Sequence, residues 1–164
     1  MRLDELNALP PAEADAALRP CVDIDSWVRG LVDARPYADR ADLLARADDL
    51  ARAWTPAEVE QALADHPRIG ERHAGSGASA QMSGREQAGV DQRDADLQRR
   101  LAEGNAAYEE RFDRIYLVRA AGRSADEILA LLEERLGNDP DTELGVTAGP
   151  LREIALLRLE GLVP

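Results

Sequence analysis

The sequence has little cysteine, little histidine and few aromatic residues, and each shortage excludes a class of protein. Its one cysteine, Cys21, allows no internal disulfide and is expected to be buried. Cys21 and the two histidines, His66 and His73, lack the spacing of metal ligands, and no HExxH or paired-cysteine pattern occurs. Aromatic residues are 4% of the chain while hydrophobic residues are 45%, so we expect a core of Leu, Val, Ile and Ala in packed helices.

Long apolar runs and clusters of basic residues are absent as well. No segment approaches the ~18 apolar residues of a membrane span, and the N-terminal residues carry acids where a signal peptide is basic. The sequence therefore predicts a soluble, cytoplasmic protein without a membrane partner. The formal charge is -12, and no window gathers the basic residues into a stripe, which argues against a nucleic-acid partner. The same field slows an anionic substrate unless local arginines offset it.

Apolar positions at helical spacing predict an all-α fold of about seven to eight helices, in a single domain that covers residues 1–164. The predicted helices cover 12–18, a segment from Asp23 or Asp25 to before Pro36, 39–54, 56 to about 66, a stripe at 97–112, 124–136, and part of 141–162 that becomes regular near Pro150. The one extended apolar run, 115–118, cannot form a sheet alone.

Three helix starts carry a capping box, in which a Ser or Thr precedes a Glu by three positions. The pairs are Thr55 with Glu58, Ser83 with Glu86, and Ser124 with Glu127.

The stretch from His66 to Gly89 is the candidate active site, because reactive side chains stand close together in it. His66 precedes Pro67, which pushes it out of the helical region and places it at a corner of the chain. A histidine at a helix end is more often structural than catalytic. The other histidine, His73, lies in a polar stretch.

The second half of this stretch has a structural and a functional interpretation. Ser83 and Glu86 are explained by the capping box alone, but a capped helix start also directs backbone N–H groups at an anion. Gln87 adds a donor and an acceptor beside it.

Two polar residues fall on apolar helix faces. Arg158 follows Leu151, Ile154 and Ala155, so it is either a snorkelling side chain or a buried guanidinium that meets a ligand oxygen. Asn105 interrupts the stripe at 97–112 and could satisfy a buried backbone group. The loop with Ser76 and Ser79 forms neither a nucleophile elbow nor a phosphate-binding loop, and no cofactor site is visible.

Taken together, these segments resemble the 2-oxo-4-hydroxy-4-carboxy-5-ureidoimidazoline (OHCU) decarboxylase family, whose members catalyse the last step from urate to allantoin. The resemblance covers nearly the whole chain, and the pair HPRIG and SxxEQ is its most specific part. The matching segments are LNALP from Leu6, SWVRGLVDARPY from Ser26, HPRIGER from His66, SGREQAG from Ser83, NAAYEERF from Asn105 and REIALLRLEGL from Arg152.

The resemblance implies an all-helical enzyme that uses no cofactor, forms a homodimer and binds a small ureidoimidazoline. It assigns acid/base chemistry to His66, assisted by Glu86. The substrate-binding positions that it implies are Pro67, Ser83, Gln87, Arg158 and the backbone around Val118. The chain departs from the family after Phe112, because relatives often have a glycine and a proline where this sequence reads Asp113, Arg114, Ile115.

The implied reaction needs no cofactor because the substrate carries a ring C=N bond that accepts the electrons released with CO2. The enzyme would supply placement, an apolar environment and a proton on one face of the ureido-bearing carbon. Two other interpretations remain: a helical interaction module, which would not need this histidine, glutamate and arginine, and another cofactor-free lyase or isomerase that acts on a related ureido compound.

Overall fold

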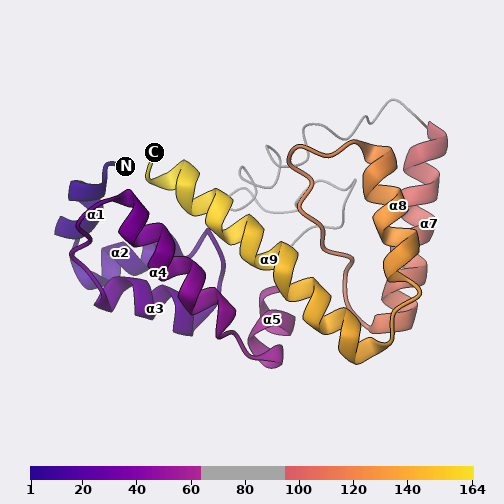
Figure 1. Cartoon of the computed structure of the whole chain (residues 1–164), viewed down its shortest axis with the longest axis horizontal. Coiled ribbons are helices and arrows are strands. Elements are labelled where there is room, and N and C mark those ends of the chain that lie inside the picture. The colour runs from indigo at the N-terminus through magenta and orange to yellow at the C-terminus, as the bar shows by residue number, and fades with distance from the viewer. Residues whose placement is uncertain (64–94) are drawn as a thin grey trace. The chain divides into compact units, whose positions relative to one another are not determined.

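The computed structural model describes residues 1–63 and 95–164, and these form helices without any strand (Figure 1). The all-α fold predicted from the sequence is therefore confirmed. The described residues hold eight helices: α1 (Leu3–Ala8), α2 (Pro11–Leu18), α3 (Asp25–Asp33), α4 (Arg40–Arg52), α5 (Pro56–Leu63), α7 (Ala95–Phe112), α8 (Ala125–Arg135) and α9 (Pro140–Leu162).

The chain divides into two compact units, and it passes from one to the other at the end of α5 and again inside α9. Unit 1 comprises Met1–Ala62 and Arg152–Pro164, and unit 2 comprises Leu63–Leu151. The single domain expected from chain length stays a prediction, and each unit is described by itself below.

Unit 1 is built around α3, which packs against α2 and α4. Its predicted apolar face is confirmed, because Ile24, Trp27, Val28 and Leu31 are all buried. The indole Nε1 of Trp27 donates to the carbonyl oxygen of Ala47 on α4 at 2.9 Å, so the largest core side chain also has its polar atom satisfied. Cys21 is buried, as expected.

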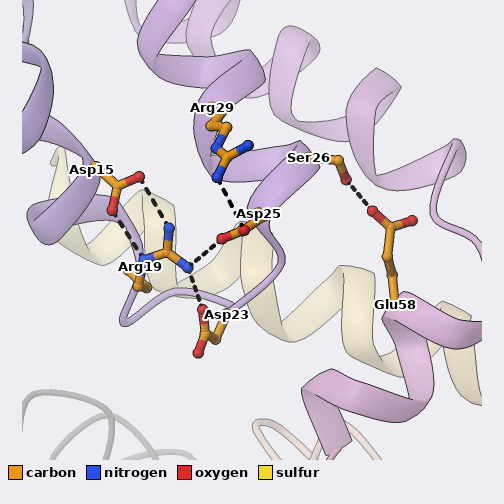
Figure 2. Close-up of polar contacts among 7 residues, drawn as sticks. All are labelled: Asp15, Arg19, Asp23, Asp25, Ser26, Arg29 and Glu58. Atoms are coloured by element: carbon orange, nitrogen blue, oxygen red, sulfur yellow. Dashed lines mark hydrogen bonds and ion pairs between the residues drawn. The ribbon is translucent and has the colours of Figure 1, made fainter.

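The start of α5 follows the predicted cap. At α5, Thr55 Oγ1 accepts from the amide of Glu58 at 3.3 Å, and Glu58 Oε2 accepts from the amide of Thr55 at 2.8 Å, which completes the capping box. Glu58 also accepts a hydrogen bond from the hydroxyl of Ser26 on α3, so the same carboxylate ties α5 to α3 (Figure 2). This bond from Ser26, followed by those from Thr55, lowers the pKa of Glu58.

Unit 2 has its core between α7 and α8. The predicted stripe on α7 is confirmed, and its buried members are Leu97, Leu101, Asn105, Tyr108 and Phe112. Gly104 lets the two helices approach closely, because a Cβ atom there would lie 2.5 Å from Cδ2 of Leu132 on α8. The start of α8 is fixed by the predicted capping box, in which Ser124 and Glu127 exchange bonds of 2.7 and 3.2 Å.

The predicted start of the last helix near Pro150 is wrong. Helix α9 begins ten residues earlier, at Pro140, and Pro150 lies inside it. Asp139 provides the cap, since its carboxylate accepts from the amide of Thr142 at 3.0 Å and Pro140 follows in the first turn. A proline inside a helix costs one backbone hydrogen bond, and here the tertiary contacts of the first turns outweigh that loss.

Helix α1 was not predicted, and a helix of six residues is not stable by itself. Tertiary hydrogen bonds hold it. The side chain of Asn7 pairs with the backbone of Tyr37 through two bonds of 2.9 Å. Arg35 Nη1 donates to the carbonyl oxygens of Leu6 and Leu9, at 2.7 Å each, where the helix ends.

The three tyrosines of the chain are all buried, and burial raises their pKa. The pKa reaches about 12 for Tyr37 and Tyr116, and that of Tyr108 is raised by burial and by its hydrogen bond to Glu143.

We therefore expect the native protein to show no tyrosinate absorbance at about pH 10, where free tyrosine ionises. The pKa of each tyrosine is higher in the folded protein than in the unfolded chain, so the neutral side chains stabilise the fold below about pH 10. This stabilisation is lost as the pH rises through the pKa of the folded state. Spectrophotometric titration checks this, with the protein in denaturant as the control. Ionisation near pH 10 without loss of helical circular dichroism would contradict it.

Two glycines in helices of unit 2 form a matched pair for testing the approach of α7 to α8. Gly145→Ala has no atom within 4 Å of the new Cβ and should stabilise the fold by about 0.5–1 kcal/mol through helix propensity. Gly104→Ala gains the same propensity but drives its Cβ into Leu132, and such overpacking costs about 1–3 kcal/mol. Urea denaturation should therefore give free-energy changes of opposite sign, and equal stabilisation by both would show that the helices do not meet closely at Gly104.

Candidate functional site

Five of the seven predicted site residues lie outside the described residues. They are His66, Pro67, Ser83, Glu86 and Gln87, all within 64–94. The roles assigned to them stay predictions. The structure places the other two, Arg158 in unit 1 and the backbone around Val118 in unit 2.

Arg158 lies on α9 and is 5% exposed, which excludes the interpretation as a snorkelling side chain. Its neighbours on the same helix face, Leu151, Ile154 and Ala155, are buried as predicted. The guanidinium Nη1 donates to the carbonyl oxygen of Pro20 at 3.3 Å. A buried guanidinium on an apolar face suits binding of a carboxylate or carbonyl oxygen, because its fork of N–H groups matches such acceptors.

The turn that carries Pro20 is fixed by its neighbour Arg19, which binds three carboxylates (Figure 2). Its Nε and Nη2 each lie 3.0 Å from an oxygen of Asp15, and its Nη1 bonds Asp23 and Asp25. The hydrogen bond from Arg19, followed by the charge of Arg29, lowers the pKa of Asp25. This network holds the end of α2 against the start of α3, and so sets the position of the Pro20 carbonyl that Arg158 contacts.

Val118 lies in the segment between α7 and α8, and Tyr116, Leu117 and Val118 are all buried. The segment begins at Asp113, whose φ of 54° lies in the left-handed region that favours glycine. Asp113 therefore adopts, at the end of α7, a conformation that glycine adopts most readily. Aspartate tolerates this region better than most residues.

Unit 2 contains a polar cluster that was not predicted from the sequence. Its buried members are Arg135, Glu143, Thr147 and Tyr108, and the half-buried Asn138 adjoins them. Arg135 Nε donates to Glu143 Oε1 at 2.7 Å, and neither residue exceeds 6% exposure. The other oxygen of Glu143 accepts from Asn138 Nδ2 at 2.7 Å, and the hydroxyl of Tyr108 donates to Oε1. The carboxylate thus has hydrogen-bond donors on both oxygens, as a buried charge requires.

The guanidinium of Arg135 also reaches beyond Glu143. Its Nη2 donates to Thr147 Oγ1 at 3.0 Å, and its Nη1 donates to the carbonyl oxygen of Leu117 at 2.7 Å. Its central carbon lies 4.9 Å from the ring centroid of Tyr116, within the range of a cation–π contact. Arg135 therefore links α8 and the start of α9 to the segment that contains Val118.

A signal for this cluster was present in the sequence. Ile128, Leu132 and Arg135 follow one another at spacings of four and three, which places Arg135 on the buried face of α8. Arg158 was identified from the same kind of spacing. The partners of Arg135, which are Glu143 and Thr147 at a spacing of four, were missed because the last helix was expected to begin after them.

In 1–63 and 95–164, no group of three or more His, Cys, Asp or Glu side chains is arranged to hold a metal ion. Within those ranges, no helix has the length and apolar character needed to cross a membrane.

Comparison with known proteins points to one family. Residues 7–160 match the family model described as OHCU decarboxylase. A protein of Amia calva named 2-oxo-4-hydroxy-4-carboxy-5-ureidoimidazoline decarboxylase is 33% identical over 131 residues, which cover 79% of this chain and 75% of the relative. The uric acid degradation bifunctional protein of Bacillus sp. (strain TB-90) is 25% identical over 161 residues, 98% of this chain but 32% of that longer protein.

A solved structure supports the fold. The crystal structure of OHCU decarboxylase in the presence of (S)-allantoin superposes with a TM-score of 0.73, over 90% of this chain and 96% of that one, at 23% identity. At this identity the likeness shows the fold alone. With the family model covering nearly the whole sequence and a relative at 33% identity, the chain belongs to the OHCU decarboxylase family.

Proposed function

We propose that this protein converts 2-oxo-4-hydroxy-4-carboxy-5-ureidoimidazoline into (S)-allantoin and CO2, as a carboxy-lyase of urate degradation. The observation that carries this conclusion is the match of residues 7–160 to the OHCU decarboxylase family. The Amia calva relative bears this activity in its name, and its similarity covers most of both chains.

The reaction can proceed on the substrate's own functional groups. The bond between the ring carbon and its carboxylate breaks, CO2 leaves, and the electron pair moves toward the neighbouring C=N bond, whose nitrogen takes up a proton. The resulting enol loses its hydroxyl proton as the ureido-bearing carbon gains one, which gives a carbonyl and a new C–H bond. The net change is the replacement of CO2 by a proton.

The side chains available to this chain fit such a mechanism. All of its 20 basic residues are arginines, so no lysine is present to form an imine with the substrate or to hold an aldehyde cofactor. The electron sink must then lie in the substrate or in another group. Because the substrate provides its own C=N bond, we expect no cofactor.

His66 handles the proton in our proposal, and Glu86 orients it or tunes its pKa. A histidine suits this role because its ordinary pKa of about 6.5 lets it both take and give a proton near neutral pH. Pro67 would hold the chain corner at which His66 stands. The delivery of a proton to one face of the carbon would make the product a single enantiomer.

The remaining candidates would bind the substrate. The buried guanidinium of Arg158 would hold carboxylate or carbonyl oxygens, and its low exposure supports this because charge-assisted hydrogen bonds are stronger away from water. Ser83 and Gln87 would contact the ureido group and ring amides, and the backbone around Val118 would complete the binding site. A homodimer and a cytoplasmic location stay predictions.

The first test replaces His66, with the other histidine as a matched control. His66→Ala should lower the rate by roughly 10²- to 10⁴-fold, the usual contribution of a general acid or base, with little change in the helical circular dichroism. His73→Ala should keep nearly full activity. The substrate is generated freshly from urate, and circular dichroism of the allantoin formed measures both rate and handedness, because the uncatalysed decay gives a racemate.

The result with the unmodified protein separates two failures. No acceleration over spontaneous decay would remove the proposed activity and turn attention to related ureido compounds. Acceleration that survives in His66→Ala would keep the activity but remove the role of that histidine.

A second test concerns Arg158, with Arg152 on the same helix as its control. Arg158→Lys keeps the charge but loses the planar fork, so we expect kcat/KM to fall about 10- to 100-fold, the range for a lost hydrogen bond to a charged group. Arg152 lies 3.4 Å from Asp48, its side chain is 31% exposed, and Arg152→Lys should leave the kinetics unchanged. Equal kinetics in the two variants would contradict a substrate contact by Arg158.

A further inference from the structure

The Leu117–Val118 peptide is held by a buried cation. Arg135 Nη1 donates to the Leu117 carbonyl oxygen at 2.7 Å, and both residues are at most 6% exposed. A charge-assisted hydrogen bond of this length, shielded from water, is among the stronger contacts that a backbone carbonyl can make. The segment is also fixed one residue earlier, where the Tyr116 hydroxyl donates to the carbonyl oxygen of Ile128 at 3.1 Å.

The guanidinium itself cannot shift freely, because each of its edges is bound. Glu143 accepts from Nε at 2.7 Å and Thr147 accepts from Nη2 at 3.0 Å. The ring of Tyr116 lies under its central carbon at 4.9 Å. The remaining nitrogen, Nη1, donates to the Leu117 carbonyl oxygen. The ion pair between Arg135 on α8 and Glu143 on α9 therefore sets the position of this peptide.

A second effect is electronic. A cation that hydrogen-bonds a carbonyl oxygen draws electron density along the peptide, which makes the N–H group on the other side a better donor. Here the N–H group in question belongs to Val118, the residue whose backbone is a candidate substrate contact. The same arginine thus both places this peptide and strengthens its donor.

We propose that Arg135 is a positioning residue for substrate binding, which acts through the Leu117–Val118 peptide and does not touch the substrate. The inference rests on the proposed function, which gives the Val118 backbone to substrate recognition. It goes further in assigning a part in recognition to a buried arginine whose other contacts are those of a structural ion pair.

The test uses Arg135→Lys in the full chain. Lysine keeps the charge, but its compact ammonium cannot serve Glu143, Thr147 and the Leu117 carbonyl together. Loss of a ground-state contact raises KM and leaves kcat nearly unchanged. We expect KM to rise on the order of tenfold, the scale of effects transmitted through an intermediate group.

A control separates positioning from stability. Leu132→Ala weakens α8 packing but removes no hydrogen bond of the polar cluster, so any partial unfolding lowers the active fraction and the apparent kcat, while KM stays constant. Where Arg135→Lys does not accumulate folded, Glu143→Gln loosens the guanidinium and should raise KM in the same direction.

A measurement that needs no substrate distinguishes failure of the positioning role from failure of the proposed function. The ¹⁵N chemical shift of the Val118 amide should move in Arg135→Lys and stay in Leu132→Ala, because it reports the hydrogen bond on the preceding carbonyl. An unmodified protein without turnover would defeat the proposed function. An active protein in which the Val118 shift moves but KM does not would overturn the positioning role and leave Arg135 a structural residue.

Discussion

The packing of unit 2 depends on one constraint: the buried guanidinium of Arg135 needs a counter-charge and hydrogen-bond acceptors. An ionised side chain at 6% exposure is tolerated only when its charge and its donors are satisfied, and removal of one partner of such a pair costs about 3–5 kcal/mol. Glu143 supplies the charge and the Leu117 carbonyl supplies a backbone acceptor, so the pair joins α8, the start of α9 and the segment after α7. A pair of nonpolar residues would pack there without fixing that carbonyl. The ion pair therefore provides orientation more than stability.

Two arginines are buried among the described residues, and each donates to a backbone carbonyl oxygen in a connection between two helices. Arg158 meets Pro20 between α2 and α3, and Arg135 meets Leu117 between α7 and α8. Carbonyls in such connections lack the partners that a helix interior provides, so a long, multiply donating side chain is well suited to them. In each unit an arginine thereby converts an irregular segment into a fixed one, which is the condition for precise contacts with a small substrate.

The sequence predicted those parts of the fold that depend on local signals. The caps at Thr55 and Ser124 and the stripe on α7 follow from spacing alone, and all of them are confirmed. The two failures arise where distant contacts override local preference: α1 is held by Asn7 and Arg35, and α9 continues through Pro150 because its first turns are bound to Arg135. For the site, spacing singled out Arg158 but could not decide between a solvated and a buried head group, since that depends on what covers the helix.

The choice of a histidine as the proton carrier is supported by what the other titratable groups do. Arginine stays protonated at physiological pH and cannot exchange a proton, and the chain has no lysine. All three tyrosines are buried with a raised pKa, and Cys21 is fully buried in the core of unit 1. Carboxyl groups and the two histidines remain as the side chains able to exchange protons near neutrality. Of these, His66 stands in the segment that carries the most specific resemblance to the family, and for this reason we propose His66, with Glu86, for the stereospecific protonation.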